Sequence, residues 1–92
     1  MQLCYQSDGN LVLYRGGTAV WASNTSGTSA GYAVMQHDGN LVVYNAAVQP
    51  VWASNTSGYN GAFVAVQNNN CALMYYGSVS NVVIPWGTST CN

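Results

Sequence analysis

The chain has 92 residues, enough for one domain and too few for two. Charged residues are almost absent, since Arg15, Asp8 and Asp38 are the whole inventory apart from His37 and the termini, and the formal net charge is -1. That charge gives no field to attract nucleic acid, and no apolar run approaches the roughly 20 residues of a spanning helix, so we expect neither a nucleic-acid partner nor membrane insertion.

Short β-favouring runs follow one another from the N-terminus. Residues 3–6 (LCYQ), 11–15 (LVLYR) and 19–23 (AVWAS) alternate their side chains with a period of two, which is typical of strands. Asp8-Gly9 lies between the first two runs, and Arg15-Gly16-Gly17 lies before the third, where tight turns favour residues that tolerate a positive φ. No segment has helical periodicity with caps. About nine strands with turns every 8–12 residues predict an all-β domain.

The same pattern returns along the chain. QSDGNLVLY at residues 6–14 recurs as QHDGNLVVY at 36–44, and AVWASNTSG at 19–27 recurs as PVWASNTSG at 50–58. A degraded third copy reads QNNNCALMY at 67–75 and IPWGTST at 84–90. We therefore divide a single domain, 1–92, into repeats at approximately 2–31, 32–62 and 63–92, which predicts a pseudo-symmetric architecture. Trp21, Trp52 and Trp86 recur at matching places, as expected for a shared central core.

The nine-residue motif carries one polar set in a fixed order. In an extended chain its even-numbered residues point away from Leu11 and Leu13; they are Gln6, Asp8, Asn10, Val12 and Tyr14. The second copy supplies the equivalent set Gln36, Asp38, Asn40, Val42 and Tyr44. A carboxylate, amides and a phenol around one apolar contact suit a neutral, hydroxyl-rich ring. The alternative is ordinary turn and strand chemistry, repeated only for symmetric folding. His37 occupies a variable position and is expected to face solvent.

The motif Q-x-D-x-N-x-V-x-Y resembles the signature of the monocot mannose-binding lectins, also called bulb-type or snowdrop-type lectins, and the resemblance covers nearly the whole chain. It implies the β-prism II fold, in which three antiparallel four-stranded sheets surround a pseudo-threefold axis and a tryptophan core, with one potential mannose site per sheet. It also implies that the motif aspartates and asparagines bond the axial 2-hydroxyl of mannose. The glutamines would bond the 3-hydroxyl and the tyrosines the 4-hydroxyl, while the valines pack against ring carbons.

The third copy departs from the motif. Gln67 and Tyr75 are kept, but Asn69, Cys71 and Leu73 replace the aspartate, the asparagine and the valine. An ionised acceptor makes stronger hydrogen bonds than an amide, and a thiol is a poor substitute for an amide. We therefore expect this degenerate third site to be inactive or much weakened.

The sequence allows more than one disulfide pairing and more than one way to complete the sheets. Cys4, Cys71 and Cys91 allow one disulfide and leave one thiol, while the family's usual cross-link is absent because its positions align near Gly9 and Tyr32. We expect the strands that usually precede the first motif in the family to be missing here, so that four-stranded sheets would need a strand from elsewhere. The segment 82–92 could add to the first sheet of a neighbour or of its own chain. We therefore expect a homodimer or a higher homo-oligomer.

These observations predict a metal-independent, multivalent lectin that binds mannose-containing glycans or glycoproteins and uses no cofactor. No carboxylate cluster could hold a metal, and two carboxylates in equivalent repeats, with a single histidine and no lysine, provide no catalytic pair. The alternative is a toxin-like (bacteriocin or antifungal), taste-active or protein-interaction module on the same fold. No signal peptide is visible, and we expect a secreted or vacuolar rather than a cytoplasmic protein.

Overall fold

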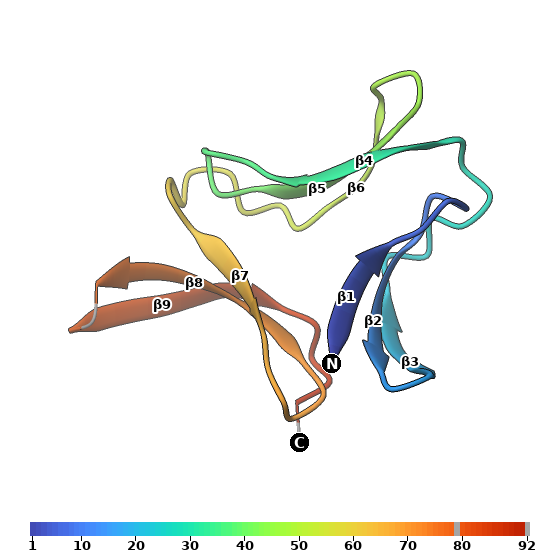
Figure 1. Cartoon of the computed structure of the whole chain (residues 1–92). Helices are drawn as coiled ribbons and strands as arrows, with labels where there is room; N and C mark the ends of the chain where they lie inside the picture. Colours follow the sequence, from blue (N-terminus) through green and yellow to red (C-terminus); the bar gives the residue numbers. More distant parts are fainter. Residues whose placement is uncertain (79, 92) are drawn as a thin grey trace.

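The computed structural model describes residues 1–78 and 80–91 and has one antiparallel sheet for each repeat. The first sheet contains β1 (Gln2–Tyr5), β2 (Leu11–Arg15) and β3 (Thr18–Ala22). The second contains β4 (Ala30–Met35), β5 (Leu41–Asn45) and β6 (Pro50–Ala53), and the third contains β7 (Phe63–Val66), β8 (Ala72–Ser78) and β9 (Asn81–Gly87). Figure 1 shows the three sheets arranged around a common centre, as the repeats predicted. The described residues include no helix long and apolar enough to cross a membrane.

The centre of the molecule is a cluster of three tryptophans. In each sheet, a fully buried side chain of the middle strand lies opposite a tryptophan of the next strand. The pairs are Leu13 with Trp21, Val43 with Trp52 and Met74 with Trp86. The three indole rings meet edge to face, with centroids 5.4 to 5.6 Å apart, an arrangement that aromatic quadrupoles favour. The predicted tryptophan core is confirmed, although the rings remain only half-buried.

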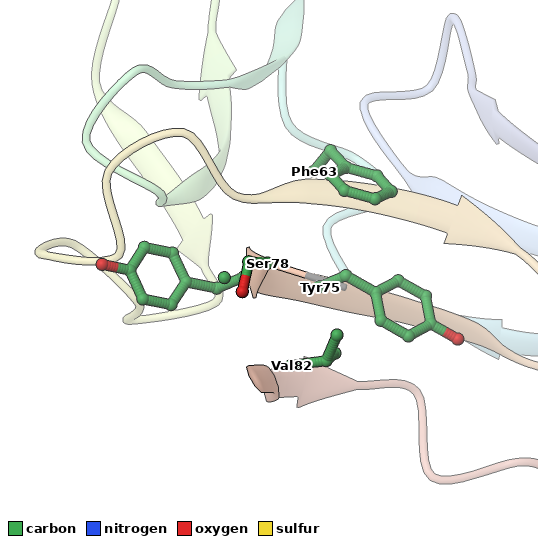
Figure 2. A pocket seen from close by; sticks show the side chains of 6 residues that line it. Phe63, Tyr75, Ser78 and Val82 are labelled. Carbon is green, nitrogen blue, oxygen red and sulfur yellow. The ribbon is translucent and has the colours of Figure 1, made fainter. Parts of the chain in front are cut away.

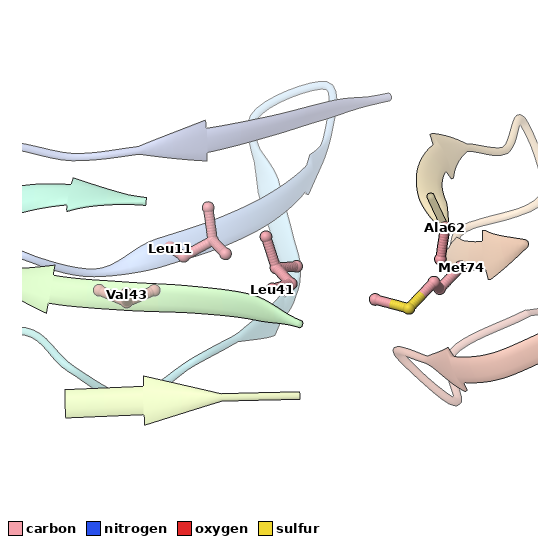
Figure 3. Packing of buried hydrophobic residues seen from close by; sticks show 5 residues of the cluster. All are labelled: Leu11, Leu41, Val43, Ala62 and Met74. Atoms are coloured by element: carbon pink, nitrogen blue, oxygen red, sulfur yellow. The ribbon is translucent and has the colours of Figure 1, made fainter. Parts of the chain in front are cut away.

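Aliphatic side chains complete this core. Figure 3 shows Leu11, Leu41, Val43, Ala62 and Met74, which form one buried cluster drawn from all three repeats. The tryptophans and several half-buried side chains pack against the cluster. Because no sheet has enough apolar surface to form a core by itself, the three repeats are stable only together.

The strand number differs from the family expectation. Across residues 1–78 and 80–91, each sheet has three strands and not four, so each has two edges with unpaired backbone groups. The segment 82–92, which could have added to the first sheet of its own chain, does not pair with that sheet. Its residues 82–87 lie in β9 and pair with β8, and this register sets Trp86 opposite Met74 in the core. Asn92, the last residue of that segment, lies outside the described residues.

Candidate functional site

The first polar residues of each motif lie in a hairpin turn, not along a strand. Between β1 and β2, Gln6 N donates to Asn10 O and Gly9 N donates to Gln6 O, both at 2.9 Å. Gly9 has a φ of 87°, which residues with a side chain rarely adopt. A hairpin with a three-residue loop, here residues 7–9, needs this left-handed conformation at its last position. The second motif makes the same two bonds at 2.9 and 3.0 Å. The predicted alternation of side chains is therefore limited to Asn10–Tyr14, and the turn brings the other polar residues to the same end of the sheet.

Each motif aspartate shapes the turn and faces solvent. Asp8 Oδ1 accepts a hydrogen bond from Asn10 N at 3.0 Å, and Asp38 Oδ1 accepts one from Asn40 N at 3.0 Å. Aspartate commonly stabilises turns by this bond to the backbone two residues ahead. Both aspartates are exposed, and no hydrogen bond among the described residues uses the second carboxylate oxygen. Each carboxylate therefore keeps an acceptor for a ligand.

Each motif asparagine is held by the segment that follows the tryptophan. Asn10 Oδ1 accepts hydrogen bonds from Ser23 Oγ and Thr25 N, both at 3.2 Å. The equivalent bonds in the second sheet, at 3.1 and 3.3 Å, join Asn40 to Ser54 and Thr56. Because protein donors engage Oδ1, the orientation of the amide is fixed and its Nδ2 donors are left for a ligand. Sequence reasoning missed these serines and threonines, although the SNT of WASNTSG, repeated with the motif, was a visible signal.

A glutamine–tyrosine hydrogen bond closes the opposite side of the site in every repeat. The glutamine Nε2 donates to the phenol oxygen, at 2.6 Å for Gln36 with Tyr44, at 3.1 Å for Gln67 with Tyr75, and also for Gln6 with Tyr14. A β-bulge or other register shift in the pairing with the next strand lies beside all three tyrosines, and bulges re-aim the neighbouring side chain. The bond leaves the glutamine Oε1 as an acceptor and the phenol hydrogen as a donor.

The motif valines lie beneath the site. Val12 and Val42 are each only 3% exposed, because both lie in a middle strand with a neighbour on either side. Val12, for example, pairs with Cys4 and Ala22. Little of either valine remains to contact a sugar ring, so the accessible part of the site is its polar rim.

The third repeat replaces the asparagine with a covalent link. Cys71 is fully buried and forms a disulfide with Cys91, which leaves Cys4 as the free cysteine of the described residues. Cys71 Sγ lies 3.3 Å from Asn69 Oδ1, but a disulfide sulfur carries no hydrogen to donate. The third repeat therefore lacks an amide at the position of Cys71 and a carboxylate at the position of Asn69, while its glutamine–tyrosine bond is retained.

Neither a metal site nor a carboxylate pair accompanies the motifs. Within residues 1–78 and 80–91, no group of three or more His, Cys, Asp or Glu side chains could hold a metal ion. Asp8 precedes β2 and Asp38 precedes β5, so the two carboxylates belong to different sheets. His37 is exposed, as its variable position predicted.

The chain is similar to lectins of monocot plants. A segment of 43 residues is 56% identical to a mannose-specific lectin from Aloe arborescens and covers 46% of this chain and 39% of that protein. A monomeric monocot mannose-binding lectin from Gastrodia elata is 37% identical, with a TM-score of 0.84 over 98% of this chain and 80% of that chain. The mannose-specific agglutinin of snowdrop (Galanthus nivalis) bulbs, solved with methyl-α-D-mannoside, is 41% identical, with a TM-score of 0.61 over 98% of this chain and 79% of that chain. No protein-family model matches the chain.

The chain belongs to the monocot mannose-binding lectin family. Its three sheets are those of the β-prism II fold, which confirms the predicted fold class. The match to the Aloe arborescens lectin spans well under half of that protein's length, at 39%.

Proposed function

We propose that the chain binds mannose-containing glycans through the motifs of its first and second sheets, without a metal ion. One observation carries this proposal. Two sheets hold the same arrangement of side chains: an exposed aspartate, an asparagine fixed by a serine and a threonine, and a glutamine bonded to a tyrosine. Symmetric folding needs the turns and the core, but it gives no reason to leave the same donors and acceptors open in both sheets.

Each of these groups has a role in recognition that follows from its free atoms. The second carboxylate oxygen of Asp38 accepts the hydrogen of the axial 2-hydroxyl, and Asn40 Nδ2 donates to the oxygen of the same hydroxyl. Tyr44 bonds the 4-hydroxyl, and Gln36 bonds the 3-hydroxyl. The first sheet repeats these roles. Glucose carries an equatorial 2-hydroxyl, which points away from this pair, and it is therefore rejected.

Each site is weak, and several sites act together. A monosaccharide on a shallow surface exchanges bonds with water for bonds with protein, which corresponds to a Kd on the order of 1 mM. Linked sites in one chain, and in a homo-oligomer formed through the open sheet edges, raise the avidity. The Cys71–Cys91 disulfide supports a secreted or vacuolar protein, because such bonds form in an oxidising compartment.

A titration with methyl-α-D-mannoside, followed by calorimetry and by amide NMR shifts, tests the proposal. We expect two sites per chain, shifts near Asn10 and Asn40, and no response to methyl-α-D-glucoside at the same concentration. The absence of mannoside shifts at both motifs would overturn the proposed function. A third equivalent site near Asn69 and Cys71 would overturn our interpretation of the third sheet.

A further inference from the structure

The three repeats differ at one position beside the motif. The motif tyrosine of each middle strand lies opposite a residue of the preceding strand, four positions before the motif glutamine. The pairs are Tyr14 with Gln2, Tyr44 with Tyr32, and Tyr75 with Phe63. Directly opposed side chains on one face of an antiparallel pair interact. The first site therefore has an amide at this position, while the second and third have an aromatic ring.

In the second sheet the two rings form one aromatic surface. The centroids of Tyr32 and Tyr44 are 5.1 Å apart, and the rings are tilted by only 30°. Tyr44 is held by Gln36, at 2.6 Å, so the position of its ring is fixed. Tyr32 keeps 46% of its surface exposed although it is a large apolar side chain in a strand. The surface thus extends from Tyr44 of the middle strand to the edge strand β4, where Tyr32 faces solvent.

The third sheet shows what such a ring pair can form. Phe63 and Tyr75 have centroids 5.8 Å apart, tilted by 32°, and they line a hollow of about 220 Å³ together with Val82. Figure 2 shows these three side chains around the opening. A hollow of this size is comparable with a single ring and smaller than a typical drug-sized pocket. Here the carboxylate and the amide of the motif are absent, so apolar surface is present without the hydroxyl-binding groups.

Only the second sheet combines the complete motif with the aromatic pair. We propose that Tyr32 and Tyr44 form an apolar subsite there, which binds a ring attached to the mannose held by the motif. This inference rests on the proposed function. If Asp38 and Asn40 hold the 2-hydroxyl, the opposite edge of the pyranose is C5 with its C6 arm. The register sets Tyr32 directly opposite Tyr44, which bonds the 4-hydroxyl beside C5, so the ligand of the subsite is a mannoside that carries an apolar ring on the 6-oxygen.

The first sheet is the internal control. It has the same motif, but Gln2 stands where the second sheet has Tyr32. Tyr32→Gln therefore makes the second site resemble the first, and Gln2→Tyr makes the first resemble the second. Both positions lie in strands that form an outer edge of their sheet, and both side chains are exposed, so neither exchange removes a core contact.

The test compares methyl-α-D-mannoside with its 6-O-benzyl derivative by amide NMR, with Asn10 and Asn40 as reporters of the separate sites. We expect the benzyl group to raise the affinity of the second site about three- to tenfold, the usual size of an aromatic contact, and to leave the first unchanged. In Tyr32→Gln, we expect the second site to bind the benzyl derivative and methyl-α-D-mannoside with about equal affinity. In Gln2→Tyr, we expect the first site to bind the benzyl derivative more tightly than methyl-α-D-mannoside.

The outcomes separate the subsite from the proposed function. An equal gain at both sites, or a gain at the second site that survives Tyr32→Gln, overturns the subsite while methyl-mannoside binding still supports the motif. If methyl-mannoside fails to bind either motif, the proposed function and the subsite both fail. Circular dichroism of each variant verifies the fold, and Gln2→Tyr gives an independent answer if Tyr32→Gln is unstable.

Discussion

The motif aspartates provide the sharpest test of the binding mechanism. Asp8→Asn combined with Asp38→Asn removes both carboxylates and keeps the shape of each side chain. An asparagine still has an Oδ1 that can accept the 3.0 Å bond from the backbone nitrogen two residues ahead. The third repeat already carries Asn69 at the matching position. We therefore expect this double variant to fold like the parent chain.

The loss of affinity follows from the change in charge. A hydrogen bond to an ionised acceptor contributes about 1.5–3 kcal/mol, and 1.4 kcal/mol corresponds to a factor of ten. Because no hydrogen bond among the described residues uses the second oxygen of either carboxylate, protein contacts do not compensate for the lost charge. Each site should weaken by more than tenfold, from about 1 mM to beyond the range of a practical titration.

The matching alanine variant separates the turn from the ligand contact. Asp8→Ala with Asp38→Ala also removes the bond to the backbone, which costs about 0.5–1.5 kcal/mol of stability per turn, or less at an exposed position. Mannoside binding by calorimetry and unfolding in urea, measured on both double variants, should show equal losses of affinity and unequal losses of stability. A folded asparagine variant that binds mannoside with the parent affinity would refute the assigned role of the aspartates.

The remaining predictions concern the core, metal independence, the disulfide and assembly. Trp21→Ala or Trp52→Ala removes two of the edge-to-face contacts and costs about 3–5 kcal/mol, so circular dichroism should show an unfolded chain; a cooperative melt near that of the parent would contradict this. Treatment with EDTA should leave glycan binding unchanged, and its loss would exclude direct contact by the motifs alone. Replacing Cys71 and Cys91 by serine opens a link across 20 residues and should lower the free energy of unfolding in urea by about 3 kcal/mol, while both mannoside sites persist; a loss of those sites would show that the third sheet supports them. Because each sheet has two open edges, we expect the chain to form a homo-oligomer, and a monomer at micromolar concentration in analytical sedimentation would contradict this prediction.

Local structure and the repeat could be predicted from the order of the amino acids. Period-two alternation placed the strands within one or two residues, as in 19–23 against Thr18–Ala22, because strand periodicity is a property of neighbouring residues. Asp8-Gly9 predicted a turn because few residues tolerate a positive φ, and Gly9 has a φ of 87°. The repeated tryptophans predicted the centre of the molecule, since equivalent residues in pseudo-symmetric units meet near their axis.

The contacts of each motif residue depend on how the strands come together in space. The alternation of side chains assigns a face, but it does not reveal which strand covers that face, so Val12 was expected outside and is 3% exposed. Asn10 is oriented by Ser23, which lies 13 residues away and reaches it only through the hairpin. The pairing of Cys71 with Cys91, and the pairing of Tyr32 with Tyr44, likewise depend on register and on approach in space. Such long-range contacts have no local periodicity, and therefore only the folded chain specifies them.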